Sequence, residues 1–181
     1  MNHVIILGPG RCGTTVLWYL LKEYGVDTGE EAEVIQNFRD ELLSGKRRMP
    51  YIVKGTGALS RNLNENLDRH KMSVDHIFFC VRRYEPMLAS HIKKKKDTGK
   101  YKGLSLDALT DELSVELPET LGITLFNLIE RNHPFTVIEF PRSAQDEQYC
   151  YDKLTEGLSL DREQFSSAWR KTVNPNLIRH G

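Results

Sequence analysis

Residues 4–15 are Val4-Ile5-Ile6-Leu7-Gly8-Pro9-Gly10-Arg11-Cys12-Gly13-Thr14-Thr15, and the apolar run 16–21 follows them. An aliphatic run, then three glycines, then hydroxyl residues that open a second apolar run, predicts a buried strand, a tight loop and a helix. Glycines let the backbone approach an anion closely, and the first turn of a helix offers unpaired N–H groups and a positive dipole end. The stretch therefore predicts a phosphate-binding loop at residues 8–15.

The spacing of residues 8–15 matches the nucleoside triphosphate loop G-x-x-x-x-G-K-[ST] except at the lysine, where Thr14 stands. That lysine normally contacts the β- and γ-phosphates, and no second basic residue occupies its place, so triphosphate hydrolysis is disfavoured. Arg11 supplies the basic side chain of the loop. For the loop taken alone, a glycine-rich turn that binds no ligand is the alternative interpretation.

The loop resembles that of the sulfotransferases that use 3′-phosphoadenosine 5′-phosphosulfate (PAPS), whose loop is roughly G-x-P-[RK]-[ST]-G-T-[TS]. By this resemblance the 5′-phosphate is surrounded by Arg11 and the loop amides. The cofactor-binding residues of the loop would be Gly10, Arg11, Cys12, Gly13, Thr14 and Thr15. Gly10 replaces a frequent proline and Cys12 a usual serine, and neither change removes a charge or an essential glycine. A helix-terminal position would lower the pKa of Cys12, whereas simple replacement of the serine is the plainer interpretation.

A second phosphate motif follows the apolar residues 77–81, which predict a central strand that leads into Arg82. In the same family, an arginine at a strand end and a serine eight positions later bind the 3′-phosphate, and Arg82 and Ser90 have this spacing. A guanidinium fork and a helix hydroxyl can hold one phosphate between them. Two phosphate motifs in the family's order favour a cofactor site over a chance match.

Residues 29–33 are Gly29-Glu30-Glu31-Ala32-Glu33. Such a cluster of carboxylates is typical of a solvated turn or of the first turn of a helix. Tyrosylprotein sulfotransferases carry Gly-Glu-Glu at a similar distance beyond the loop, and by that resemblance Glu31 is the catalytic base, with Glu30 as the neighbouring candidate.

Lys54 lies at the carboxyl end of the short β-rich run 51–55, at the edge where open parallel sheets bind ligands. By the resemblance, Lys54, Arg11 and Thr14 would stabilise charge that develops on the leaving phosphate. The cytosolic family branch has a histidine base two positions after such a lysine, but this chain has Thr56 there. An exposed lysine at a strand end is the alternative for Lys54.

The remaining pattern predicts an α/β fold: three layers, with a mainly parallel sheet of four or five strands and helices on both faces, similar to P-loop NTPases. Further strands are expected at residues 51–55 and 135–140, and helices at 14–24, 60–70 and 105–131. Gly25 would end the first helix, and Pro118 would break the third. The lysines at 93–96 are expected at a solvated helix end, with the route of an anionic acceptor as the alternative.

The chain has 181 residues, of which 39% are hydrophobic and 28% charged, which predicts a single sulfotransferase-like domain over residues 1–181. Its 25 basic and 25 acidic residues cancel, so nucleic acid is not an expected partner. No apolar stretch approaches the length of a membrane span, and we expect a cytoplasmic protein. Cys12, Cys80 and Cys150 are too widely spaced to suggest a disulfide framework or a zinc site, and no metal is expected.

The sequence thus predicts a sulfotransferase that moves the sulfuryl group from PAPS, as co-substrate, to a hydroxyl or amine acceptor of unknown class and releases adenosine 3′,5′-bisphosphate (PAP). Two alternatives stay open. A small nucleotide kinase would share the fold, although the absent loop lysine argues against it. A non-catalytic nucleotide-binding module would keep the phosphate sites but lack an acceptor pocket.

Overall fold

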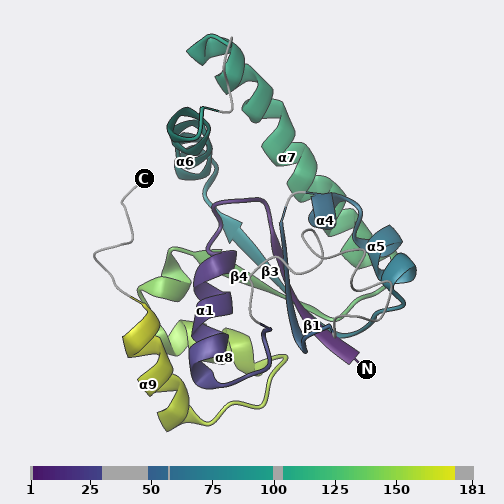
Figure 1. The fold of residues 1–181 in the computed structure, drawn as a ribbon, viewed down its shortest axis with the longest axis vertical. Coiled ribbons are helices and arrows are strands. Elements are labelled where there is room, and N and C mark those ends of the chain that lie inside the picture. Colours follow the sequence, from purple (N-terminus) through teal and green to yellow (C-terminus); the bar gives the residue numbers. More distant parts are fainter. Residues whose placement is uncertain (1, 30–48, 57, 100–103, 174–181) are drawn as a thin grey trace.

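The computed structural model describes residues 2–29, 49–56, 58–99 and 104–173 (Figure 1). Four strands form one parallel sheet in the order β2-β1-β3-β4. Their bounds are β1 Asn2–Gly8, β2 Ile52–Thr56, β3 Ser73–Arg82 and β4 Phe135–Phe140. The prediction of a mainly parallel sheet is confirmed, and β1 and β3, which lead into the two predicted phosphate motifs, are adjacent central strands.

Helices cover both faces of this sheet, as Figure 1 shows. On one face lie α1 Thr14–Tyr24, α8 Glu147–Thr155 and α9 Arg162–Thr172. On the other lie α4 Ala58–Arg61, α5 Leu63–His70 and the second half of α7 Leu106–Glu130. The short helix η1 Arg142–Ala144 follows β4, and α6 Tyr84–Asp97 follows β3 and packs against the first half of α7.

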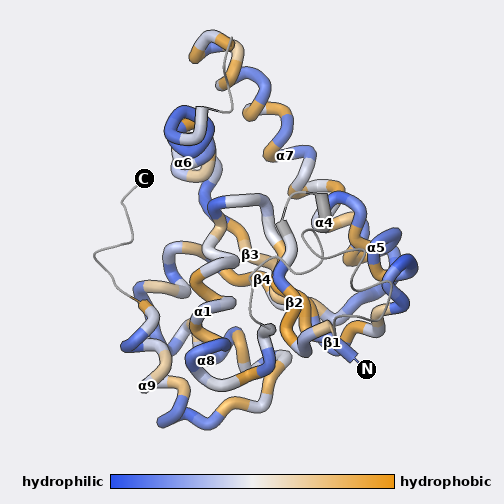
Figure 2. Tube along the Cα trace, in the orientation of Figure 1, coloured by the Kyte–Doolittle hydropathy of each residue, from blue (hydrophilic) through white to orange (hydrophobic). Residues whose placement is uncertain are grey.

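Alternation along β1 explains the two cores, because successive side chains of a strand point to opposite faces of the sheet. Val4 and Ile6 pack into the core that contains α1, α8 and α9, whereas Ile5 and Leu7 pack into the core that contains α5 and Leu128 of α7. Figure 2 shows the hydrophobic residues concentrated on the strands, while α6 is largely hydrophilic. The predicted three-layer α/β architecture is confirmed.

Helix α1 begins and ends where the glycines predict. Gly13 (φ 85°) precedes its first residue, and Gly25 (φ 98°) follows its last. The Gly25 N–H donates to the Lys22 carbonyl, and the Val26 N–H donates to the Leu21 carbonyl, so two carbonyls at the end of the helix are satisfied.

The predicted break at Pro118 is wrong, because α7 is one helix of 25 residues that contains this proline. Proline has no N–H, so the carbonyl of Ser114 loses its donor within the helix. The hydroxyl of Tyr84, at the start of α6, donates to that carbonyl at 3.5 Å and replaces the missing bond. A tertiary contact therefore keeps the helix continuous.

Candidate functional site

The loop between β1 and α1 lies at the carboxyl edge of the sheet, next to the end of β3. Arg11 (φ 69°) and Gly13 (φ 85°) both have the left-handed backbone conformation. A Cβ atom on Gly13 would lie 2.4 Å from Cδ2 of Phe140, so the space beside this position admits only glycine. Gly13 is also the N-cap of α1 and provides no side-chain acceptor, which leaves the first-turn amides for an anion.

The two predicted phosphate motifs meet at this loop. Nε of Arg11 donates to Oγ of Ser90 at 2.9 Å, and Nη1 of Arg82 donates to the Arg11 carbonyl at 3.3 Å. Within the described ranges, neither guanidinium forms an ion pair with a carboxylate. The structure therefore gathers two cations and a hydroxyl that were predicted from separate stretches of sequence.

The Arg82 guanidinium lies over the ring of Phe140, with 5.3 Å between Cζ and the ring centroid. Its Nε atom is buried and has no hydrogen-bond partner among the described residues. Burial and the nearby Arg11 guanidinium lower the pKa of Arg82, although an arginine stays charged at neutral pH. A buried donor without a partner is costly, and an anion bound here would satisfy it.

One face of α6 carries the contacts to the loop. Ser90 contacts Arg11, Nε2 of His91 lies 2.7 Å from the Gly10 carbonyl oxygen, and the sulfur of Met87 lies 3.3 Å from Sγ of Cys12. Met87, Ser90 and His91 are spaced i, i+3 and i+4, so they share a face. Sequence reasoning found Ser90 but missed Met87 and His91, although this spacing from Ser90 was the available signal.

Cys12 is 1% exposed and donates its thiol proton to the Met87 sulfur. Burial raises its pKa to about 12, and the opposing effect of Arg82 is smaller. The expectation of a low-pKa thiol is therefore wrong, because removal from water outweighs the helix terminus. Cys12 acts as a small buried side chain, as the serine-replacement interpretation predicts.

Lys54 is the middle residue of β2, which continues to Thr56, so the expectation that it lies at the carboxyl end of the strand is wrong. It is paired in register with Ile6 and is only 4% exposed, which also excludes the exposed-lysine alternative. Strand alternation places it on the α1 face of the sheet together with Ile6. Its catalytic role stays a prediction.

Among the other predicted site residues, Thr14 is buried at 3% exposure and Thr15 is exposed on the first turn of α1. Glu30 and Glu31 lie outside the described residues. No group of three or more histidine, cysteine or acidic side chains in the described ranges is placed to hold a metal ion. Within those ranges, no helix combines the length and apolar character needed to cross a membrane.

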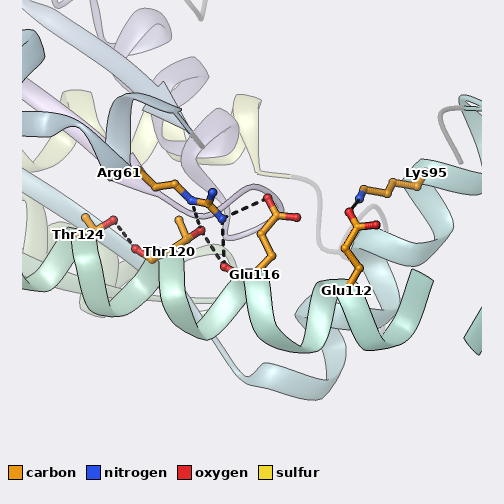
Figure 3. Close-up of polar contacts among 6 residues, drawn as sticks. All are labelled: Arg61, Lys95, Glu112, Glu116, Thr120 and Thr124. Atoms are coloured by element: carbon orange, nitrogen blue, oxygen red, sulfur yellow. Dashed lines mark hydrogen bonds and ion pairs between the residues drawn. The ribbon is translucent and has the colours of Figure 1, made fainter. Parts of the chain in front are cut away.

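Side-chain contacts join α7 to α4 and α6, the helices near the loop (Figure 3). Nε of Arg61 donates to Oγ1 of Thr120 at 2.8 Å, and its Nη2 lies 3.4 Å from the Glu116 carboxylate. One turn closer to the start of α7, the Glu112 carboxylate lies 2.9 Å from Nζ of Lys95, and this ion pair ties α6 to α7.

Helix α7 also contacts the loop indirectly, through Ser60, the residue before Arg61. Oγ of Ser60 donates to the Gly8 carbonyl at 3.4 Å, and Oγ1 of Thr124 donates to the Ser60 carbonyl at 3.3 Å. The first glycine of the loop and the helix that carries Ser90 are thus both anchored to α7.

Comparisons with known proteins agree with this architecture. No protein-family model matches the chain, and no curated protein matches it. Among solved structures, the chain is similar to mouse sulfotransferase SULT7A1 complexed with PAP, with a TM-score of 0.69 and 12% sequence identity. The similarity covers 94% of this chain and 64% of the mouse chain, so this chain spans about two thirds of that protein's length. The chain therefore has the sulfotransferase fold.

Proposed function

We propose that this protein is a PAPS-dependent sulfotransferase that transfers the sulfuryl group to a hydroxyl or amine acceptor and releases PAP. The observation that carries the proposal is the cluster at the loop, where Arg11, Arg82 and Ser90 are in contact without a carboxylate partner in the described chain. A site that gathers cations and orphan donors is suited to a ligand with several anionic groups. PAPS carries such groups at its 3′ and 5′ positions.

In the proposed binding mode, the amides of Gly13, Thr14 and Thr15 hold the 5′-phosphate, and Arg82 with Ser90 holds the 3′-phosphate. The acceptor oxygen or nitrogen attacks sulfur as the bond from sulfur to the phosphate oxygen breaks. Negative charge then develops on that oxygen, where Arg11 and Lys54 stabilise it. Glu31 takes the proton of the acceptor.

Phosphoryl transfer from ATP is a weaker proposal for the same fold. The triphosphate loop requires a lysine that reaches the β- and γ-phosphates, but Thr14 occupies this position and its short side chain is buried. A direct comparison of ligands tests the point. We expect calorimetry to show tighter binding of PAP than of ATP, and the reverse order would favour a kinase.

The catalytic proposal is tested by radiolabelled sulfuryl transfer from PAPS to a panel of phenols, sugars, amines and tyrosine peptides. For an acceptor found in this way, Glu31→Gln should lower turnover by about a hundredfold or more and leave PAP affinity nearly intact, because the amide cannot accept the proton. Glu30→Gln is the matched control.

Other outcomes of the variant and acceptor experiments would point to a different base or to a different function. A larger loss in Glu30→Gln would show that the base is the neighbouring carboxylate. No loss in either variant would refute a carboxylate base. PAP binding without transfer to any acceptor would favour a non-catalytic nucleotide-binding module.

A further inference from the structure

We propose that His91 is a positioning residue of the phosphate loop, which holds the Gly10 carbonyl from α6 and, when it gains a proton, strengthens the binding of an anion there. The inference rests on the proposed function, because it concerns the affinity of the same site for PAP and PAPS. It adds a residue, and a dependence on protons, that neither phosphate motif contains.

The imidazole of His91 lies close against Gly10 of the loop. Nε2 of His91 lies 2.7 Å from the Gly10 carbonyl oxygen, which can only accept, so Nε2 carries the proton. In the neutral ring, Nδ1 is then the bare nitrogen and is available for protonation. A Cβ atom on Gly10 would lie 3.0 Å from Cε1 of His91, so the ring also fills the space beside this glycine.

The bond fixes the loop at the point where its backbone is least relaxed. Arg11 has a φ of 69°, a left-handed conformation that is unfavourable for a residue with a Cβ atom. His91 holds the carbonyl of Gly10, the residue before Arg11. The carbonyl of Arg11 accepts from Arg82, and the Arg11 side chain donates to Ser90. Three restraints thus keep Arg11 in place, and His91 supplies the one on its N-terminal side.

Charged groups near the His91 imidazole link its protonation to the binding of an anion in the loop. Arg11 of the loop and Lys94 of α6 act on the ring as nearby cations, and Glu116 of α7 acts on it as a nearby anion. Burial is the largest influence and lowers the pKa of His91, whereas the hydrogen bond to the Gly10 carbonyl raises it. The two cations lower the pKa further, and Glu116 opposes them. An anion in the loop would offset Arg11 and favour the protonated ring. By linkage, proton and anion then promote each other's binding.

Two variants separate the hydrogen bond from the proton. His91→Gln places an amide N–H near the position of Nε2 but does not titrate, whereas His91→Ala removes both. With PAP in calorimetry, His91→Ala should weaken binding roughly fivefold to tenfold at about pH 8, and His91→Gln by no more than about twofold. Between about pH 8 and pH 5.5, wild type should gain affinity relative to His91→Gln. Titration of the phosphates is common to all three proteins and cancels in this comparison.

The results that would overturn the inference are distinct. Equal PAP affinity in wild type and His91→Ala would remove the positioning role. The same pH profile in wild type and His91→Gln would remove the proton-linked role. A merely structural histidine would lower the melting temperature of both variants while leaving the pH profile of PAP binding unchanged, which also counts against the proposal.

Inorganic pyrophosphate separates this inference from the proposed function. Wild type that binds pyrophosphate but not PAP would refute the proposed function, and the same variants would then decide the role of His91 with pyrophosphate as ligand. Wild type that binds neither anion would overturn both proposals. Nitrogen NMR of the imidazole provides an independent readout, because free protein should show the Nε2–H form of His91 at neutral pH.

Discussion

Two histidines, His76 in β3 and His91 in α6, belong to hydrogen-bond networks that differ in charge balance. Near the start of β3, Nε2 of His76 lies 2.8 Å from Oγ1 of Thr136, which donates to the Glu156 carboxylate at 2.6 Å. Lys153 donates to the same carboxylate at 2.7 Å. Every polar partner in this network is a protein group, and the cation is paired.

The loop network has the same kinds of groups, but among the described residues no carboxylate is paired with its arginines. His91 binds a carbonyl, and Arg11 and Arg82 contact a hydroxyl and a carbonyl. In the described chain, no acidic side chain pairs with either guanidinium. Both networks contain a histidine, so the histidine does not distinguish them. The pairing of cations with carboxylates does: the cation beside His76 is paired, whereas the arginines beside His91 are not paired within the described chain.

The largest expected effect comes from substitution of one glycine in each network. Gly13 lies against the ring of Phe140, and Gly157 lies against the ring of His76. Gly13→Ala should destabilise the fold by about 3 kcal/mol, since the new Cβ would meet Phe140 at 2.4 Å and the backbone has a positive φ. Gly157→Ala would meet His76 at 2.4 Å and should cost about 2 kcal/mol, because only the overlap contributes. Urea unfolding measures both.

The two glycine variants should differ in ligand binding as well. PAP affinity of the folded fraction should fall in Gly13→Ala and stay unchanged in Gly157→Ala, because only Gly13 belongs to the loop. A loss of PAP binding in Gly157→Ala at a temperature where the protein is folded would contradict the separation of the two networks.

A smaller effect is expected when a cation is removed from each network. Arg82→Ala should weaken PAP binding by about 2 kcal/mol, since a charge-assisted fork is lost, while AMP binding changes little. Lys153→Ala, the matched change at the exposed Glu156 pair, should leave both affinities unchanged. Calorimetry with the two nucleotides decides: equal losses of PAP and AMP in Arg82→Ala would refute a 3′-phosphate site.

The smallest effect is on stability as a function of pH. Burial lowers the pKa of His76, with Glu156 acting in the opposite direction, so the folded state binds its proton less readily than the unfolded state does. Stability should therefore be complete above about pH 6.5 and fall as the pH drops below it. Urea unfolding at about pH 7.5 and pH 5.5 should show a smaller acid loss in His76→Gln than in wild type. An identical loss in both proteins would show that His76 does not contribute.

Much of the fold could be predicted because its signals are local. The aliphatic run before Gly8 and the glycines at 13 and 25 define the strand, the loop and the two ends of α1, and the structure agrees. The spacing between Arg82 and Ser90 was also sufficient to place both residues beside the loop.

What could not be predicted depends on contacts between distant segments. Pro118 indicates a break in any isolated helix, and the chain alone does not show that the Tyr84 hydroxyl reaches the Ser114 carbonyl. The acidity of Cys12 depends on its burial against Met87, which outweighs its position at a helix terminus. The roles assigned to Glu31 and Lys54 rest on resemblance, and they stay predictions.

The path of α7 restricts how this protein can change in length. Leu109, Leu113 and Leu117 belong to the core on the α1 face, whereas Leu128 belongs to the core on the opposite face, so one helix joins the two. A single inserted residue would rotate everything beyond it by about 100° around the helix axis. Deletions and insertions that evolution retains should therefore fall outside the stretch between Leu113 and Leu128, or should come in near-whole turns.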